Sequence, residues 1–321
     1  MIFKKFFDSL PPPKILDIPS FSIAVSDRNI RCVLLRKNNS NLEVVRYSEY
    51  PVPEGVISGG QIENMDEFSK ILKKIKIEYK LNYVRVSILE EKAYIFKTEI
   101  PAVKRKEVYG AIEFTLEENV PVPANELVFD YTVVGQKNEN LDVVVVALPI
   151  KNVEEYMTVL EMADLELLSL EVESQAITQA VVSPNDKENK MIVYFNGEKM
   201  SIYMINNAVV HFVSSNSIRG DIKENISYVS QEIKKIHSYW RSLDENPKDL
   251  KKDISNVLVC GDFISEDILL QISVNTKLPI ILGNVWTNIY NLNKFIPNIP
   301  FEESLAYAPA IGISIPRDIL I

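Results

Sequence analysis

One arrangement of short strands occurs twice in this chain, and it restricts the fold more than any other sequence feature. Alternating apolar residues bounded by turn residues predict a meander of three antiparallel strands beginning at Phe21, and a second such meander beginning at Met191. The six predicted strands cover residues 21–25, 29–36 and 42–49, and then 191–195, 200–205 and 208–213. Each meander is followed by predicted helices and returning strands. The sequence therefore predicts two related α/β halves.

Composition and charge fit a soluble protein of two lobes. The chain has 321 residues, of which 46% are apolar and 25% charged, and at this length a single core usually divides in two. Lysine and arginine number 35 against 44 aspartates and glutamates, with no long run of one sign, which argues against a nucleic-acid partner. No stretch approaches the ~18 apolar residues of a membrane span, and no signal peptide is recognisable.

The cysteines and histidines are expected to be structural. Cys32 and Cys260 each lie inside an apolar run, which predicts buried thiols in a reducing compartment rather than a disulfide. His211 and His237 have no companion cysteine pairs at metal-ligand spacing, and no serine has a visible base. We therefore expect a cytoplasmic protein with no metal site and no catalytic residue.

A polar stretch at 183–190 marks the boundary between the halves. The expected division is an N-terminal arm at 1–19, a first lobe at 20–183 and a second lobe at 184–321. A β/α block at about 101–165 has the character of an insertion within the first lobe. In the second lobe, apolar residues from Ile222 to Trp240 recur every three or four positions and predict a long helix within a helical segment at about 221–254.

Several motifs give this pattern a family resemblance. A strand, a hairpin and a strand, repeated around a cleft and followed by a strand–glycine turn–helix, resemble the duplicated, ribonuclease H-like core of actin-like nucleotide-binding proteins. More specifically, the chain resembles the PilM family, the actin-like proteins of type IV pilus assembly, over nearly its whole length. The resemblance is carried by YVRVS at 83–87, EEKAYIFKTEIP at 90–101, AIEFTLEENVP at 111–121, PPPK at 11–14, GVI at 55–57, GQI at 60–62 and VFDY at 128–131.

The resemblance implies a bilobal α/β actin-like fold with an inserted subdomain of the FtsA type, which the block at about 101–165 fits. It also implies a cytoplasmic adaptor at the inner face of the membrane, whose groove beside that subdomain takes the N-terminal tail of a PilN-like inner-membrane protein. An extended peptide binds through main-chain hydrogen bonds and side-chain pockets. The candidate contacts are Tyr94, Phe96, Phe114 and Phe129, for which a role in the core stays open, as does self-association of the chain.

The resemblance also locates a nucleotide cleft that has lost two acidic residues. In actin-like ATPases the first hairpin surrounds the phosphates, and an Asp near the end of the first strand holds the Mg²⁺ water shell. That position falls on Ala24, and the corresponding position in the second half falls on Tyr194. The candidate nucleotide-binding residues are Ser26, Asp27, Arg28, Asn29, Glu173, Asn196, Gly197, Lys199, Gly261 and Asp262.

Loss of the two acids argues against ATP hydrolysis, because phosphoryl transfer depends on positioning and charge compensation. Binding of ATP with Mg²⁺ stays open: Gly261 keeps the first glycine of the adenosine turn, whereas Asp262 and Tyr194 add bulk to the cleft. The alternatives to an adaptor are an ATP-binding, weakly hydrolysing actin-like ATPase and an FtsA-like protein that forms filaments.

Overall fold

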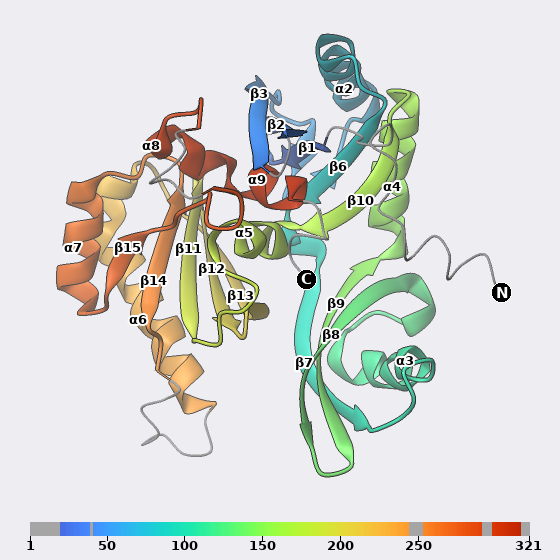
Figure 1. Cartoon of the computed structure of the whole chain (residues 1–321), viewed down its shortest axis with the longest axis vertical. Coiled ribbons are helices and arrows are strands. Elements are labelled where there is room, and N and C mark those ends of the chain that lie inside the picture. Colours follow the sequence, from blue (N-terminus) through green and yellow to red (C-terminus); the bar gives the residue numbers. More distant parts are fainter. Residues whose placement is uncertain (1–19, 39–40, 244–252, 291–296, 316–321) are drawn as a thin grey trace.

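Two five-stranded sheets with the same strand arrangement form the centre of the computed structural model, which describes residues 20–38, 41–243, 253–290 and 297–315 (Figure 1). The first sheet has the order β10-β6-β1-β2-β3 and the second the order β13-β12-β11-β14-β15. In each sheet the central strand pairs antiparallel with the next strand of a meander and parallel with a later strand. The duplication expected from the sequence is therefore confirmed.

The strands have the following bounds: β1 Ser20–Val25, β2 Asn29–Asn38, β3 Asn41–Pro51, β6 Tyr83–Ile88, β10 Glu166–Val172, β11 Lys190–Asn196, β12 Lys199–Asn206, β13 Val209–Ser217, β14 Asn256–Gly261 and β15 Ile280–Leu282. A two-strand pair, β4 Ile57–Ser58 and β5 Gln61–Ile62, follows the first meander. The last predicted strand, at 208–213, begins one residue too early. Asn207 and Ala208 both have positive φ and form the hairpin turn, so that Asn206 pairs with Val209.

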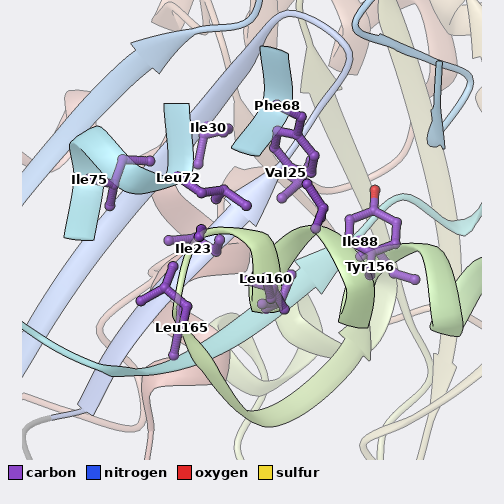
Figure 2. Packing of buried hydrophobic residues seen from close by; sticks show 14 of the residues in the cluster. Ile23, Val25, Ile30, Phe68, Leu72, Ile75, Ile88, Tyr156, Leu160 and Leu165 are labelled. Atoms are coloured by element: carbon purple, nitrogen blue, oxygen red, sulfur yellow. The ribbon is translucent and has the colours of Figure 1, made fainter. Parts of the chain in front are cut away.

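Two helices cover one face of the first sheet and enclose its core. Asn64 caps α2 (Met65–Tyr79) by accepting a 3.0 Å hydrogen bond from the Glu67 amide, as its spacing predicts. α4 (Ile150–Met162) packs beside α2, and Figure 2 shows their apolar side chains meeting those of β1 and β2. Removal of this apolar surface from water is the main force that holds the helices to the sheet.

A third, smaller sheet extends from the first lobe with its own core. Strands β7 (Tyr94–Pro101), β8 (Leu127–Lys137) and β9 (Asn140–Pro149) have the order β7-β9-β8 and pack against α3 (Val108–Asn119). This unit runs from Tyr94 to Pro149, whereas the insertion predicted from the sequence runs from about 101 to 165. β7 pairs with β9 from its first residue, whereas α4 and β10 pack with the first sheet. The division of the chain into domains otherwise stays a prediction, and the arm at 1–19 lies outside the described residues.

In the second lobe, α6 (Ile226–Ser242) and α7 (Glu266–Thr276) pack against one face of the sheet. The helix expected from Ile222 begins with a short 3₁₀ turn, Ile222–Asn225, which Asp221 caps by accepting a hydrogen bond from the Lys223 amide. No helix in the described part of the chain is long and apolar enough to cross a membrane.

Two helices cross between the lobes, near the centre of Figure 1. α5 (Glu173–Val181) and α9 (Ala308–Ser314) are in direct backbone contact, since a Cβ placed on Gly312 would lie 1.7 Å from the Ala176 carbonyl oxygen. One apolar cluster surrounds this crossing and includes side chains of both sheets, among them Leu35 and Tyr194. The two lobes therefore share a continuous interior.

Candidate functional site

The two meander hairpins face each other across the cleft between the lobes. Residues 26–28 connect β1 to β2, and residues 197–198 connect β11 to β12. The Lys199 ammonium lies 2.7 Å from an Asp27 carboxylate oxygen, and Arg28 lies 2.9 Å from Glu198. A cavity of about 740 Å³ opens at these hairpins. The structure thus brings together the hairpin candidates predicted from the sequence. The cavity is lined by Ser26, Asp27, Arg28, Asn196, Glu198, Lys199, residues of the 52–58 segment, Leu89 and Ser217.

The hairpin amides that could cradle a phosphate already have partners within the chain. The Ser26 hydroxyl accepts hydrogen bonds from the amides of Asn29 at 3.1 Å and Arg28 at 3.4 Å. In the second hairpin, the Gly197 amide donates to the Asp262 carboxylate at 2.8 Å. A phosphate entering the cleft would have to replace these intramolecular bonds.

Asp27 uses both of its carboxylate oxygens. The amides of Gly59 and Gly60 donate to them at 3.0 and 3.1 Å, and Lys199 adds its ammonium from the other lobe. Lys199 also pairs with the carboxylate of Glu91. Burial alone would lower the pKa of Lys199, but its bonds to Asp27 and Glu91 outweigh this effect and raise it. The charge network across the cleft is therefore complete without a ligand.

Arg31 makes a second connection between the lobes, beside the position of the missing magnesium ligand. It is the cross-strand partner of Ala24, and its guanidinium, 7% exposed, lies 2.6 Å from Asp262 and 2.7 Å from Glu49. It also donates to the Ala306 carbonyl at 3.0 Å, an oxygen that the buried Tyr194 hydroxyl reaches at 3.3 Å. A fixed guanidinium at this point repels Mg²⁺.

The residues present in the cleft therefore do not fit Mg²⁺-ATP as those of an active ATPase would. Ala24 and Tyr194 supply no carboxylate for the metal, and the carboxylates of Asp27 and Asp262 repel phosphate oxygens. Gly261, predicted as a glycine of the adenosine turn, lies against the neighbouring strand: with φ of 114°, its Cβ would lie 2.0 Å from the Phe195 carbonyl oxygen.

Two carboxyl groups are buried behind the second hairpin. Glu173, at the start of α5, accepts hydrogen bonds from Tyr203 at 3.2 Å and Asn196 at 3.5 Å. Glu90 accepts one from the Ser174 amide at 2.9 Å, while its other oxygen has no partner among the described residues. Burial raises the pKa of Glu90 to about 7 and raises that of Glu173 well above its usual range. Sequence reasoning identified Glu173 but missed Glu90, although Glu90 lies two residues after the end of β6.

A second cavity lies beside the inserted sheet. This groove, of about 620 Å³, is bounded by the first sheet, the inserted sheet and α5, and by the β12–β13 turn of the second lobe. Of the four aromatic residues proposed to bind a partner, only Phe129 lines it. Tyr94 and Phe96 line another cavity of about 420 Å³ with Phe212, and Phe114 is 86% exposed on α3. Tyr94, Phe96 and Phe129 all pack against the core between the inserted sheet and α3, and Phe114 stands apart from them.

The remaining candidates have structural surroundings. Cys32 and Cys260 are buried free thiols, as predicted. His211 packs edge-on against Trp240, and His237 lies 2.7 Å from Asp253. No group of three or more potential metal ligands occurs in the part of the chain that the structure describes.

The matching sheets, the crossing helices and the paired hairpins define an actin-like ATPase fold. A family model described as type IV pilus assembly protein PilM matches residues 22–221, so the chain belongs to this family. A solved structure described as a PilM–PilN type IV pilus biogenesis complex is similar, with a TM-score of 0.77 and 15% identity, over 95% of this chain and 99% of that one.

The ethanolamine utilization protein EutJ from Carboxydothermus hydrogenoformans has a TM-score of 0.53 and 12% identity, over 95% of this chain and 90% of that one. These two likenesses support the fold. No curated protein sequence matches the chain.

Proposed function

We propose that this chain is an adaptor of a type IV pilus or related secretion machinery, which binds the N-terminal tail of a PilN-like inner-membrane protein at the cytoplasmic face of the membrane. Membership of the PilM family supports the assignment to pilus assembly. The similar solved structure is described as a complex of PilM with PilN, which supports the choice of partner. The observation that carries the proposal is the 620 Å³ groove beside the inserted sheet.

The groove lies between two open sheet edges. Among the described strands, β8 pairs only with β9, and β10 pairs only with β6. Both strands contribute side chains to the groove, β8 through Val128, Asp130 and Thr132, and β10 through residues 170–172. An open edge carries unpaired backbone donors and acceptors, to which an extended peptide can add as a further strand.

The chemistry of the lining indicates which peptide would fit. Apolar side chains such as Val146 and Leu148 form much of the wall, and its charged side chains among the described residues, Asp130 and Glu171, are both acidic. A tail with apolar residues at alternate positions and at least one positive charge complements this surface. Of the four aromatic candidates only Phe129 borders the groove, and its ring stacks on Tyr109 of α3, on the face of the inserted sheet opposite to Val128 and Asp130. All four aromatic residues would therefore act on the peptide only through other contacts.

The test is a calorimetric titration of the chain with a synthetic peptide of a PilN-like cytoplasmic tail. We expect saturable binding, and we expect Thr132→Lys to weaken it by at least about 10-fold, because the new charge enters the groove beside the bound basic peptide. Val133→Lys is the matched control: Val133 is the next residue of β8, so its side chain points to the opposite face, and it does not line the groove. No saturable binding, or an equal loss in both variants, would contradict the proposal.

Within the same proposal the cleft plays no part in hydrolysis. The lack of carboxylates at Ala24 and Tyr194, and the position of Arg31 beside Ala24, support this view. Phosphate release from Mg²⁺-ATP above a heat-treated control would favour the alternative of a weakly hydrolysing ATPase.

A further inference from the structure

Asp27 is held in the cleft as an anionic ligand would be held. Three donors from two other segments meet at its carboxylate: the successive amides of Gly59 and Gly60, in the turn between β4 and β5, and the Lys199 ammonium from the second lobe. Both glycines have positive φ, 55° and 75°, a conformation that other residues rarely adopt. Paired amides with a cation form the donor set by which proteins bind phosphate oxygens.

Asp27 and its donor Lys199 lie beside open space. Asp27, Lys199 and Ser58 line the 740 Å³ cavity at the hairpins, so an anion larger than a carboxylate has room next to them. The other cation of this cavity, Arg28, is paired with Glu198. Glu54 adds a further negative charge to the lining. Without the Asp27 carboxylate, the two glycine amides would lose their acceptor, and Lys199, which also pairs with Glu91, would remain in the cavity lining as a cation for an incoming anion.

We propose that the Gly59–Gly60 amides and Lys199 form a phosphate-binding site that is closed by the chain's own Asp27 carboxylate. Its ligand class is a phosphate group, whether of inorganic phosphate, of pyrophosphate or of a nucleotide. Because Asp27 is tethered beside its donors, it competes at a high effective concentration and excludes free phosphates. The Asp27–Lys199 pair then joins the two lobes whether or not nucleotide is present.

The first test measures amide hydrogen exchange at Gly59 and Gly60 with and without millimolar pyrophosphate. In the wild-type chain we expect slow exchange that pyrophosphate does not change. In Asp27→Ala we expect exchange about 10-fold faster or more, because both amides lose a charged acceptor, and pyrophosphate should restore slow exchange. Glu54→Gln is the matched control: it removes the same charge from the same cavity, while the two amides still donate to Asp27, so it should behave as the wild type.

Calorimetry with pyrophosphate, inorganic phosphate and ATP, each without metal, completes the test. We expect Asp27→Ala to bind pyrophosphate at least about 10-fold more tightly than the wild type, and a further Lys199→Met substitution to remove the gain. If Asp27→Ala does not fold, Asp27→Asn, which keeps the side-chain volume, must show a smaller gain of the same sign. Equal affinity in wild type and both variants, or unchanged exchange at the two glycines, overturns the proposal. No peptide is present, so this outcome is independent of the groove.

Discussion

Replacement of Arg31 by methionine tests whether the cleft is held together by buried charge. Arg31 is 7% exposed and its partner Asp262 is 10% exposed, so removing the guanidinium leaves a buried carboxylate with only the Gly197 amide as a donor. Breaking a buried ion pair in this way typically costs 3–5 kcal/mol. Glu49, which is 45% exposed, regains water and adds little. We therefore expect the free energy of unfolding to fall by about 3 kcal/mol.

The measurement is urea unfolding followed by circular dichroism and tryptophan fluorescence, whose agreement checks for a single transition. Arg28→Met is the matched control, because Arg28 also pairs across the cleft, with Glu198, but the two side chains are 67% and 58% exposed. It should cost less than about 1 kcal/mol. Adding Asp262→Asn to Arg31→Met removes the stranded charge and should recover about 1–2 kcal/mol. Similar losses for Arg31→Met and Arg28→Met, or no recovery in the double variant, would refute the reasoning.

Two further predictions concern stability away from the hairpins. Gly312→Ala should lower the free energy of unfolding in urea by more than about 3 kcal/mol, because its Cβ would overlap the Ala176 carbonyl. Gly110→Ala is the control: no atom lies near the new Cβ, so this variant should be neutral or more stable by up to about 1 kcal/mol. Equal effects of the two substitutions would count against a tight crossing. Glu90→Gln tests how stability depends on pH. The pKa of the Glu90 carboxyl is raised from 4.5 to about 7 on folding, so between these values the folded state binds more protons than the unfolded state. The contribution of this carboxyl to stability is therefore lost as pH rises from 4.5 to about 7. The variant should therefore gain stability relative to the wild type between pH 4.5 and 7.5, by up to about 3 kcal/mol, and a difference that does not change with pH would exclude this role.

The duplicated sheets could be predicted because their signal is local. Strand alternation and the Asn64 cap depend on residues close in sequence, and both are confirmed. The turn at Ala208 was missed because an alanine with positive φ has no sequence signature. The inserted sheet was placed too late because β7 continues the apolar pattern of the first lobe, and only its pairing with β9 assigns it elsewhere.

The charge network of the cleft could be predicted only in part. The family resemblance identified Asp27, Lys199 and Asp262 as cleft residues, but it treated them as candidates to meet a nucleotide. Their actual partners are up to 231 positions away in the sequence, as in the pair of Arg31 with Asp262, and no local pattern encodes such a contact. Tyr94, Phe96 and Phe129 share one face of the inserted sheet and pack against its core, whereas Phe114 is exposed on α3. This arrangement depends on the pairing of β7 and β8 with β9, which no local pattern encodes.

The close backbone contact at Gly312 determines how the lobes can move relative to each other. At Gly312 no side chain separates the backbones of α5 and α9, so sliding one helix along the other at this point would bring their backbone atoms into overlap. α5 also carries Glu173 at its cleft end and Gln175 and Thr178 in the wall of the groove. A displacement of α5 would therefore move the acid behind the hairpins and part of the groove wall together.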